Sequence, residues 1–382
     1  MNFKKVVTIA ATAGALAALA VPALAEITPY GSIRMTTFWN TVDTEAAGIN
    51  NGSTTDFKEN LHANSRLGVN FTNGTQGGRI ELGLNTGGGV SVRHAYGTQK
   101  FDFGTVLVGQ TENPYYLFSA SVAKDDGVNN AYGSLWDTRT PQIKLTLNNG
   151  FYVAAMMPTT YSTSTTTALP TGTTENYLPK MNVGYEGKAG NFAYGAGVVG
   201  QTYKQTVAAV AAADATPTKF AVLASPAQSD TVTSLMGYFH GKLTAGAAAM
   251  QFNLGVGQNI GDMGFMNGNA TTGAAGATNR YVSKTATRAG EDTTTIEGYV
   301  QGSYKLSPML GLNAGVGYVQ DDNDSFVNKD NRMMMFVNTN ITVAKGFVVT
   351  PEFAYFDQLD QAANNVKGDK EYLVGARWMM NF

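Results

Sequence analysis

The side chains that carry most enzyme and metal chemistry are scarce in this chain. It has no cysteine and only three histidines, His62, His94 and His240. A chain without cysteine forms no disulfide, thiolate zinc site or iron–sulfur cluster, and it has no cysteine nucleophile. Neither a Gly-x-Ser-x-Gly nucleophile elbow nor a His-Glu-x-x-His zinc-binding sequence occurs. We therefore expect neither a catalytic site nor a cofactor or bound metal.

Two motifs have the composition of ligand sites. Residues 195–200 spell Gly-Ala-Gly-Val-Val-Gly, but a dinucleotide-binding turn also needs a strand before it, a helix after it and an acidic residue about 20 positions later. We interpret the motif as the glycine-rich face of a strand. The acidic residues from Asp321 to Asp330 offer oxygen ligands for Ca²⁺, yet they lack the glycine and terminal glutamate of an EF-hand loop. We expect a solvated hairpin tip there, with calcium binding as the open alternative.

The composition indicates a large folded body of low charge. Of 382 residues, 43% are hydrophobic and 14% are charged, whereas an average soluble protein has about 25% charged residues. The 18 Tyr, 19 Phe and 3 Trp disfavour a disordered chain. A net charge of −2 gives no electrostatic footprint for nucleic acid, so we expect no nucleic-acid partner.

The first 25 residues have the layout of a secretory signal peptide. Lys4 and Lys5 precede an apolar run, and Ala23-Leu24-Ala25 supplies the small residues that signal peptidase reads. We expect cleavage after Ala25, which leaves 26–382 as the mature chain. An uncleaved membrane anchor is the alternative, and the short apolar run disfavours it. No later apolar stretch is long enough to predict a spanning helix.

The mature sequence alternates with a two-residue period almost throughout. Leu310 and Leu312 alternate with glycine and asparagine, and the run from Tyr372 to Phe382 alternates apolar residues with a mixed face. This pattern predicts strands with one apolar and one polar face. Because Pro351 lies within such a run and cannot donate to a ladder, we expect a bulge or weakened pairing there. About sixteen strands are predicted, at residues 27–40, 61–73, 78–86, 88–101, 103–112, 139–149, 150–159, 177–187, 190–204, 232–243, 245–258, 291–305, 309–320, 331–344, 346–358 and 370–382.

The connections between these runs alternate between short and long. Short turns lie at 72–77 and at Asn149-Gly150, whereas 113–138 and 259–290 are long and polar. Short turns on one side and long loops on the other are typical of a transmembrane β-barrel with an even strand number. A soluble β-sandwich is the alternative, but so many long strands would need too large an interior. The predicted fold class is therefore an all-β transmembrane antiparallel β-barrel.

A series of short motifs also occurs in order along the chain. They are Tyr30-Gly31-Ser32, Ser65-Arg66-Leu67-Gly68, Arg93-His94-Ala95-Tyr96-Gly97, Phe103-Gly104-Thr105-Val106, Gly109-Gln110 and the terminal Phe382. Together they resemble the general porins of Gram-negative outer membranes, most sharply over residues 28–112. The resemblance implies a single porin domain at 26–382 in the cell outer membrane. It also implies that Phe382 is a signal for the barrel-assembly machinery.

The resemblance further implies a pore constriction. In such porins the third long loop folds into the barrel, and its carboxylates face arginines on the opposite wall. That loop would be 113–138 here, while Arg66 and Arg93 match the family's wall arginines. The predicted constriction residues are Arg34, Arg66, Arg93, Arg139, Asp125 and Asp126.

Physical arguments support an inward position for the arginines. A charge on the lipid face costs about 2–4 kcal/mol at the bilayer midplane, and rings of charged side chains are a means by which pores discriminate among solutes. Two features depart from the family pattern. Gln110 stands where the family has arginine, and the second long loop, which commonly latches onto a neighbouring subunit, spans only about Thr86 to Gly89.

The sequence thus predicts a water-filled outer-membrane pore for passive diffusion of small hydrophilic solutes and ions, without a cofactor. Its expected partners are outer-membrane lipid and lipopolysaccharide, the barrel-assembly machinery and two further copies in a homotrimer. A solute-specific channel is the alternative, because Phe38, Tyr299 and Phe336 have lumen-facing parity and could form an aromatic path. An outer-membrane enzyme and an adhesin, the latter with Thr-rich loops, are less favoured alternatives.

Overall fold

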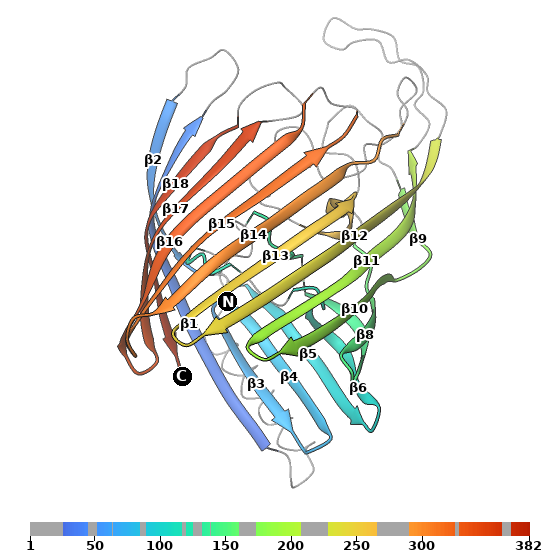
Figure 1. Cartoon of the computed structure of the whole chain (residues 1–382), viewed down its shortest axis with the longest axis horizontal. Coiled ribbons are helices and arrows are strands. Elements are labelled where there is room, and N and C mark those ends of the chain that lie inside the picture. Colours follow the sequence, from blue (N-terminus) through green and yellow to red (C-terminus); the bar gives the residue numbers. More distant parts are fainter. Residues whose placement is uncertain are drawn as a thin grey trace, which may run out of the picture.

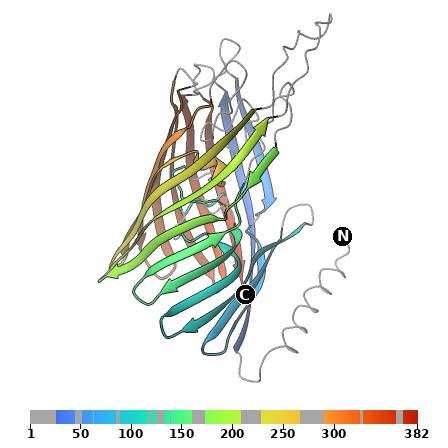
Figure 2. The ribbon, with the colours of Figure 1, turned by 90° about the vertical axis from the view of Figure 1, so that its right-hand side faces the viewer.

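The alternating residues form one antiparallel sheet that closes on itself (Figures 1 and 2). The computed structural model describes residues 26–44, 52–62, 64–84, 89–116, 120–124, 132–137, 139–159, 173–207, 228–265, 290–324, 328–360 and 368–382. Its strands are β1 (Glu26–Thr44), β2 (Gly52–Leu61), β3 (Arg66–Thr72), β4 (Gln76–Leu84), β5 (Val90–Phe101), β6 (Gly104–Glu112), β7 (Arg139–Leu147), β8 (Phe151–Met156), β9 (Thr173–Asn176), β10 (Lys180–Ala189), β11 (Phe192–Val207), β12 (Gln228–Ala245), β13 (Ala248–Gln258), β14 (Thr294–Lys305), β15 (Leu310–Asp322), β16 (Asp330–Ala344), β17 (Phe347–Asp360) and β18 (Lys370–Asn381).

The first and last strands close the barrel. β1 pairs with β18 from Ser32↔Asn381 to Asp43↔Lys370. The backbone of the terminal Phe382 adds two hydrogen bonds with Gly31, of 2.7 and 3.1 Å. Closure satisfies the backbone groups of the two edge strands, as a lipid environment requires.

In the described part of the chain, eighteen strands make sixteen courses across the wall, because two courses are interrupted. β2 and β3 both pair with β1, one after the other, and β9 and β10 pair with β11 in the same way. The predicted barrel of about sixteen strands is confirmed. The predicted strand 61–73 is β3 alone, and β2 was missed because its sequence does not alternate apolar with polar residues.

Turn glycines and the strand proline adopt the backbone geometry that their chemistry predicts. Gly150 and Gly190 sit in hairpin turns at φ +94° and +61°, a left-handed conformation that glycine adopts without steric cost. In β17, Pro351 pairs with Ala376 of β18, but the ladder to β16 has no pair at Thr350 or Pro351. The expected weakening of the pairing is therefore present on one side of that strand.

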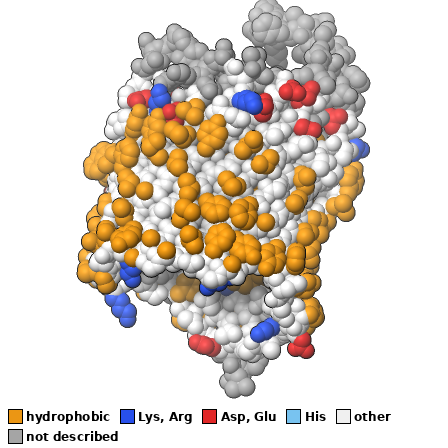
Figure 3. Space-filling view, in the orientation of Figure 1, with side chains coloured by type: hydrophobic (Ala, Val, Ile, Leu, Met, Phe, Trp, Pro, Cys, Tyr) orange, Lys and Arg blue, Asp and Glu red, His pale blue; other side chains and the backbone are white. Residues whose placement is uncertain are grey.

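The two faces of the wall differ as a membrane barrel requires. Figure 3 shows a broad band of hydrophobic side chains over the outer face, with charged side chains gathered at its upper and lower margins. The outward residues include Val198, Leu254, Val300 and Val316, which are exposed, whereas inward positions such as Glu297 are buried. None of the described helices has the length and apolarity needed to cross a membrane.

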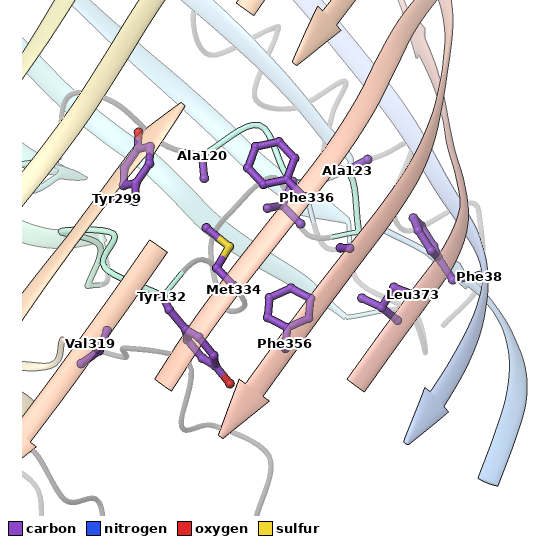
Figure 4. Packing of buried hydrophobic residues seen from close by; sticks show 12 residues of the cluster. Phe38, Ala120, Ala123, Tyr132, Tyr299, Val319, Met334, Phe336, Phe356 and Leu373 are labelled. Carbon is purple, nitrogen blue, oxygen red and sulfur yellow. The ribbon is translucent and has the colours of Figure 1, made fainter. Parts of the chain in front are cut away.

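Part of the connection between β6 and β7 lies inside the barrel. Its segments 120–124 and 132–137 contribute Ala120, Val122, Ala123 and Tyr132 to an apolar cluster with lumen-facing residues of β1 and β14–β18 (Figure 4). A second cluster joins Tyr115 and Leu135 to lumen-facing residues of β8, β11 and β12 and to the short 3₁₀ helix η1 (Ile260–Met263). The connection therefore packs against the interior of the wall at both ends.

Candidate pore-constriction site

The four predicted arginines all lie on one arc of the wall. Arg34 is on β1, Arg66 on β3, Arg93 on β5 and Arg139 on β7. These strands are neighbours or next neighbours in the sheet. Arg79 of β4 and Arg377 of β18 join them. We call these six side chains the arginine wall.

A single buried carboxylate organises the centre of the arginine wall. The Glu81 side chain has no exposed surface, and its Oε1 lies 2.6 Å from Arg93 Nε and 3.7 Å from Arg66 Nη1. Its Oε2 pairs with Arg79 and accepts a 2.7 Å hydrogen bond from the Tyr30 hydroxyl. Three guanidiniums thus share one carboxylate, and their positive charge exceeds the charge of Glu81 by two.

A β-bulge places two consecutive residues of β5 beside this carboxylate. Glu81 pairs with His94 and Leu82 pairs with Val92, so Arg93 is an extra residue in the ladder. In a regular strand Arg93 and His94 would face opposite sides. The bulge lets both side chains lie buried on the inner side. His94 Nε2 lies 3.8 Å from Glu81 Oε1.

The outer members of the arginine wall have their own partners. Arg139 Nη2 lies 3.0 Å from Glu112 Oε1, at the end of β6. Arg34 Nε donates a 3.0 Å hydrogen bond to Ser32 Oγ. Arg34 interacts electrostatically with Arg93, and Arg377 with Arg34. The six guanidiniums therefore form one connected patch of positive potential.

The described loop segments 120–124 and 132–133 lie mainly against a different arc, formed by β14 to β17, which we call the loop wall. Glu352 of β17 accepts hydrogen bonds from the backbone N–H groups of Ala123 and Lys124, and from Asn338 Nδ2 at 2.8 Å. The Gln301 side chain exchanges two 2.7 Å hydrogen bonds with Ser121. These bonds fix segment 120–124 to the wall through both its backbone and a side chain.

The loop also approaches the wall at glycines. A Cβ on Gly317 would overlap the carbonyl oxygen of Tyr132, and one on Gly133 would overlap the backbone of Gly298. The Tyr132 ring meets that of Phe356 edge-on at 5.7 Å between centroids. The absence of side chains on Gly133 of the loop and Gly317 of the wall lets this part of the loop lie directly on the sheet.

The two ends of the third loop are tied together by a buried acid. Asp137 Oδ2 lies 2.7 Å from Lys180 Nζ and accepts a 2.5 Å hydrogen bond from the Tyr115 hydroxyl. Asn113 donates to its Oδ1. Burial, followed by the Asp137 charge, raises the pKa of Tyr115 well above its usual value. Tyr115 therefore remains a hydroxyl donor to Asp137 over the whole physiological pH range.

The sequence also predicted two loop aspartates in the constriction and three aromatic residues that could line the pore. Asp125 and Asp126 lie outside the described residues. Phe38, Tyr299 and Phe336 do face inward, but each is only 3% exposed because they pack in the loop cluster, so they form no open aromatic path.

The sequence left calcium binding by the acidic residues from Asp321 to Asp330 as an open alternative. Asp321 accepts a 2.6 Å hydrogen bond from Thr295 Oγ1 and pairs with Arg332. Across the described ranges, no group of three or more His, Asp or Glu side chains is arranged to hold a metal ion.

Sequence reasoning missed Glu81, Arg79 and Arg377 as members of the site. Arg79 and Glu81 share a face of one predicted strand, and Arg377 shares a face with Gly375 in the last one. The position of these residues on the inward face of a predicted strand was the feature that could have identified them. It does not show which strands are adjacent, so it does not reveal that one carboxylate meets three arginines.

Comparisons with known proteins identify the family and the fold. A model of the Gram-negative porin family matches residues 10–325. The chain belongs to the Gram-negative porin family. This porin is an outer-membrane channel for the passive diffusion of small hydrophilic solutes and ions. A search of the curated proteins finds no match.

Solved structures share the fold of this porin at low sequence identity. The outer-membrane channel DcaP of Acinetobacter baumannii is 18% identical, with a TM-score of 0.69, over 95% of this chain and 99% of that one. OmpT of Vibrio cholerae, in a trimer form, is 17% identical, with a TM-score of 0.52, over 93% and 99%. The anion-selective porin of Comamonas acidovorans is 13% identical, with a TM-score of 0.52, over 94% and 100%. At these identities the likeness shows the fold alone.

Proposed function

We propose that the arginine wall forms the basic side of the pore constriction and makes this porin prefer anions. Arg34, Arg66, Arg93 and Arg139 supply the field, and the third loop narrows the passage from the opposite side. Asp125 and Asp126, which follow Lys124 in the loop, supply the acidic side. Solutes pass by diffusion, without a chemical step.

The observation that carries this proposal is the excess of positive charge around Glu81. The arginine wall has six guanidiniums, and its two carboxylate partners are Glu81 and Glu112. Positive charges still exceed negative ones by two when Asp125 and Asp126 are included. Charges that line an aqueous passage with low-dielectric walls raise the local concentration of counter-ions. A porin with the same fold is anion-selective, which agrees with the proposed preference.

Single-channel recording in planar bilayers under a KCl gradient tests the ion preference. The reversal potential should have the sign of chloride selectivity at about 0.1 M salt, where the Debye length is about 10 Å. The preference should weaken at about 1 M, where that length is about 3 Å. A cation-selective reversal potential at low salt would overturn the proposal.

We further propose that the porin is a homotrimer and that the outer edge of β2 lies in the subunit interface. β2 pairs with β1 over ten residues, and within the described chain no strand pairs with its other edge. β4 pairs with β3, the other half of the same course, and it ends at Leu84, one residue beyond the pair Arg66↔Gly83. An open strand edge is not tolerated in contact with lipid. A second copy of the chain supplies protein to cover it.

The absence of cysteine makes the subunit contact directly testable. Phe57 lies on β2 with its ring 5.1 Å from that of Trp39, and both are exposed. Phe57→Cys, labelled at the thiol with a photoactivatable cross-linker, should cross-link to the neighbouring subunit in outer-membrane fractions, because a three-fold interface brings different residues of two copies together. Phe239→Cys, on the outer face of β12, should remain monomeric. Equal cross-linking of the two variants would contradict the placement, and a monomeric mass in mild detergent would contradict the trimer.

Export and assembly complete the proposal. Cleavage after Ala25 would start the mature chain at Glu26, the first residue of β1, and N-terminal sequencing of outer-membrane protein tests it. Phe382 is 70% exposed beside Gly31 at the seam, a position open to the barrel-assembly machinery. Deleting Phe382 should lower the yield of the heat-modifiable barrel. Outer-membrane lipid and lipopolysaccharide would surround the apolar band.

A further inference from the structure

The course formed by β2 and β3 is interrupted between Leu61 and Arg66, beside the arginine wall, and we call this interruption the excursion. Leu61 pairs with Met35 and Arg66 pairs with Ser32, so four residues, 62–65, stand opposite only two on β1. The extra length moves the backbone out of the ladder. Asn64, within this excursion, is 7% exposed and lies on the inner side.

The excursion is held firmly by its neighbours. Ser65 Oγ accepts a 2.9 Å hydrogen bond from the Arg34 N–H and donates one of 3.1 Å to the Arg34 carbonyl. The Leu84 N–H donates to the Ser65 carbonyl at 2.8 Å, and the Asn64 N–H donates to His62 Nδ1 at 3.0 Å. The position of Asn64 is therefore set by its own bond to His62 and by the bonds of the adjacent Ser65 to β1 and to the end of β4.

Asn64 contacts the two arginines that match the porin family pattern. Its backbone carbonyl accepts a 3.0 Å hydrogen bond from Arg66 Nε, and its side-chain Oδ1 accepts a 2.6 Å hydrogen bond from Arg93 Nη1. Glu81 contacts the same two guanidiniums through Oε1. Arg93 is thus held at Nε by a carboxylate and at Nη1 by a neutral amide.

We propose that Asn64 is a positioning residue that sets the ion preference of the pore by orienting Arg93 beside Arg66. A neutral acceptor at Nη1 fixes the orientation of the Arg93 guanidinium, whose Nε already contacts Glu81, without cancelling its charge. An acceptor with a charge would hold it equally well but would reduce the local potential. This inference rests on the proposal that the arginine wall forms the constriction.

Two substitutions separate orientation from charge. Asn64→Ala keeps the backbone carbonyl that binds Arg66 but removes the acceptor for Arg93. Arg93 then keeps only its contact with Glu81, and its guanidinium is free to turn away from the passage. The chloride-to-potassium permeability ratio should therefore fall toward, but not reach, that of Arg93→Gln. Asn64→Asp keeps the acceptor and adds a negative charge, so the ratio should fall further, and the fall should shrink at high salt.

Asn40 of β1 provides the matched control, because it is also a buried inward asparagine and its Oδ1 has no hydrogen-bond partner in the described part of the chain. Asn40→Ala should leave the ratio unchanged, and Asn40→Asp should lower it less than Asn64→Asp does. Both Asn64 variants should assemble into heat-modifiable barrels. If Asn64→Ala does not assemble, the comparison of the two aspartate variants decides the question.

The outcomes distinguish the positioning role of Asn64 from the proposal that the arginine wall forms the constriction. If Arg66→Gln and Arg93→Gln leave the reversal potential unchanged, the arginine wall is not the constriction. If those variants shift it while Asn64→Ala matches the wild type, only the positioning role is wrong. An Asn64→Asp shift no larger than that of Asn40→Asp would also overturn the positioning role.

Discussion

The arginine wall and the loop wall each contain a buried glutamate, and the two glutamates have opposite kinds of partner. Glu81 is surrounded by three guanidiniums and a tyrosine hydroxyl. Glu352 is bonded to two backbone N–H groups and an asparagine amide, all of them neutral. One carboxylate balances charge within the wall, whereas the other holds a loop in place.

This difference shows how one barrel acquires two unlike walls. On the loop wall, apolar residues such as Met334 and Phe336 are covered by the third loop. On the arginine wall the side chains are too highly charged for an apolar segment to cover, because burying unpaired charge is costly. Under the proposed function, the loop would therefore narrow the passage from one side and leave the charged side in contact with solute.

The largest effect is expected from Glu81→Gln. Removing one partner from a buried ion pair destabilises a protein by about 3–5 kcal/mol, and here three guanidiniums would lose their shared counter-charge. The urea midpoint of the refolded barrel should fall strongly, and the assembled channels should become more anion-selective. A midpoint equal to that of the wild type would show that Glu81 does not organise the arginine wall.

Glu352→Ala should have a smaller effect on stability and a clear effect on current. Leaving buried donors unsatisfied costs about 1–3 kcal/mol, and segment 120–124 would lose its main backbone anchor. Single-channel conductance and current fluctuation should both increase, because the loop would no longer be fixed to the wall. Glu186→Ala, which removes an ion pair with Lys144 close to the turn between β10 and β11, is the control. Identical recordings from the two variants would refute the anchoring role.

Neutralising first the arginines and then the loop aspartates tests how each set of charges contributes to the ion preference. Replacing Arg66 and Arg93 by glutamine should shift the reversal potential toward cations. Replacing Asp125 and Asp126 by asparagine should shift it toward anions. Both shifts should diminish from 0.1 M to 1 M salt, as the Debye length falls from about 10 Å to about 3 Å.

Asp322 and Asp324 serve as the distal control for that experiment. They lie at and just beyond the end of β15, and their replacement should change the reversal potential much less. If the distal pair shifted it as much as the arginine pair, the constriction would lie elsewhere, although the barrel would stand.

The fold was predictable from the sequence because the membrane imposes a strong local pattern. The run at 309–320 alternates between lipid-facing and inward residues, and it is β15 almost residue for residue. β2 escaped detection because Phe57 is its only aromatic residue and polar residues occupy both faces. Where a strand carries no apolar face, periodicity has no signal to detect.

The site was predictable only in part, because its key contacts depend on register and irregularity. Arg66 and Arg93 could be chosen from their motifs, and both do lie on the inner side. Their shared partner Glu81 depends on which strands pair, and the inward turn of both Arg93 and His94 depends on a bulge. The position of Asn64 depends on two extra residues opposite β1. None of these features leaves a periodic trace in one sequence.

The smallest effect is expected from Glu112→Gln, which tests the same chemistry as Glu81→Gln at an exposed site. The Glu112 side chain is 37% exposed and forms a 3.0 Å ion pair with Arg139. Because water screens such a pair, its loss should cost at most about 1 kcal/mol. The urea midpoint should therefore remain close to that of the wild type. The released charge of Arg139 should still shift the reversal potential slightly toward anions at low salt. A loss of stability as large as that of Glu81→Gln would mean that the arginine wall is held together along its whole length, and not by the single carboxylate at its centre.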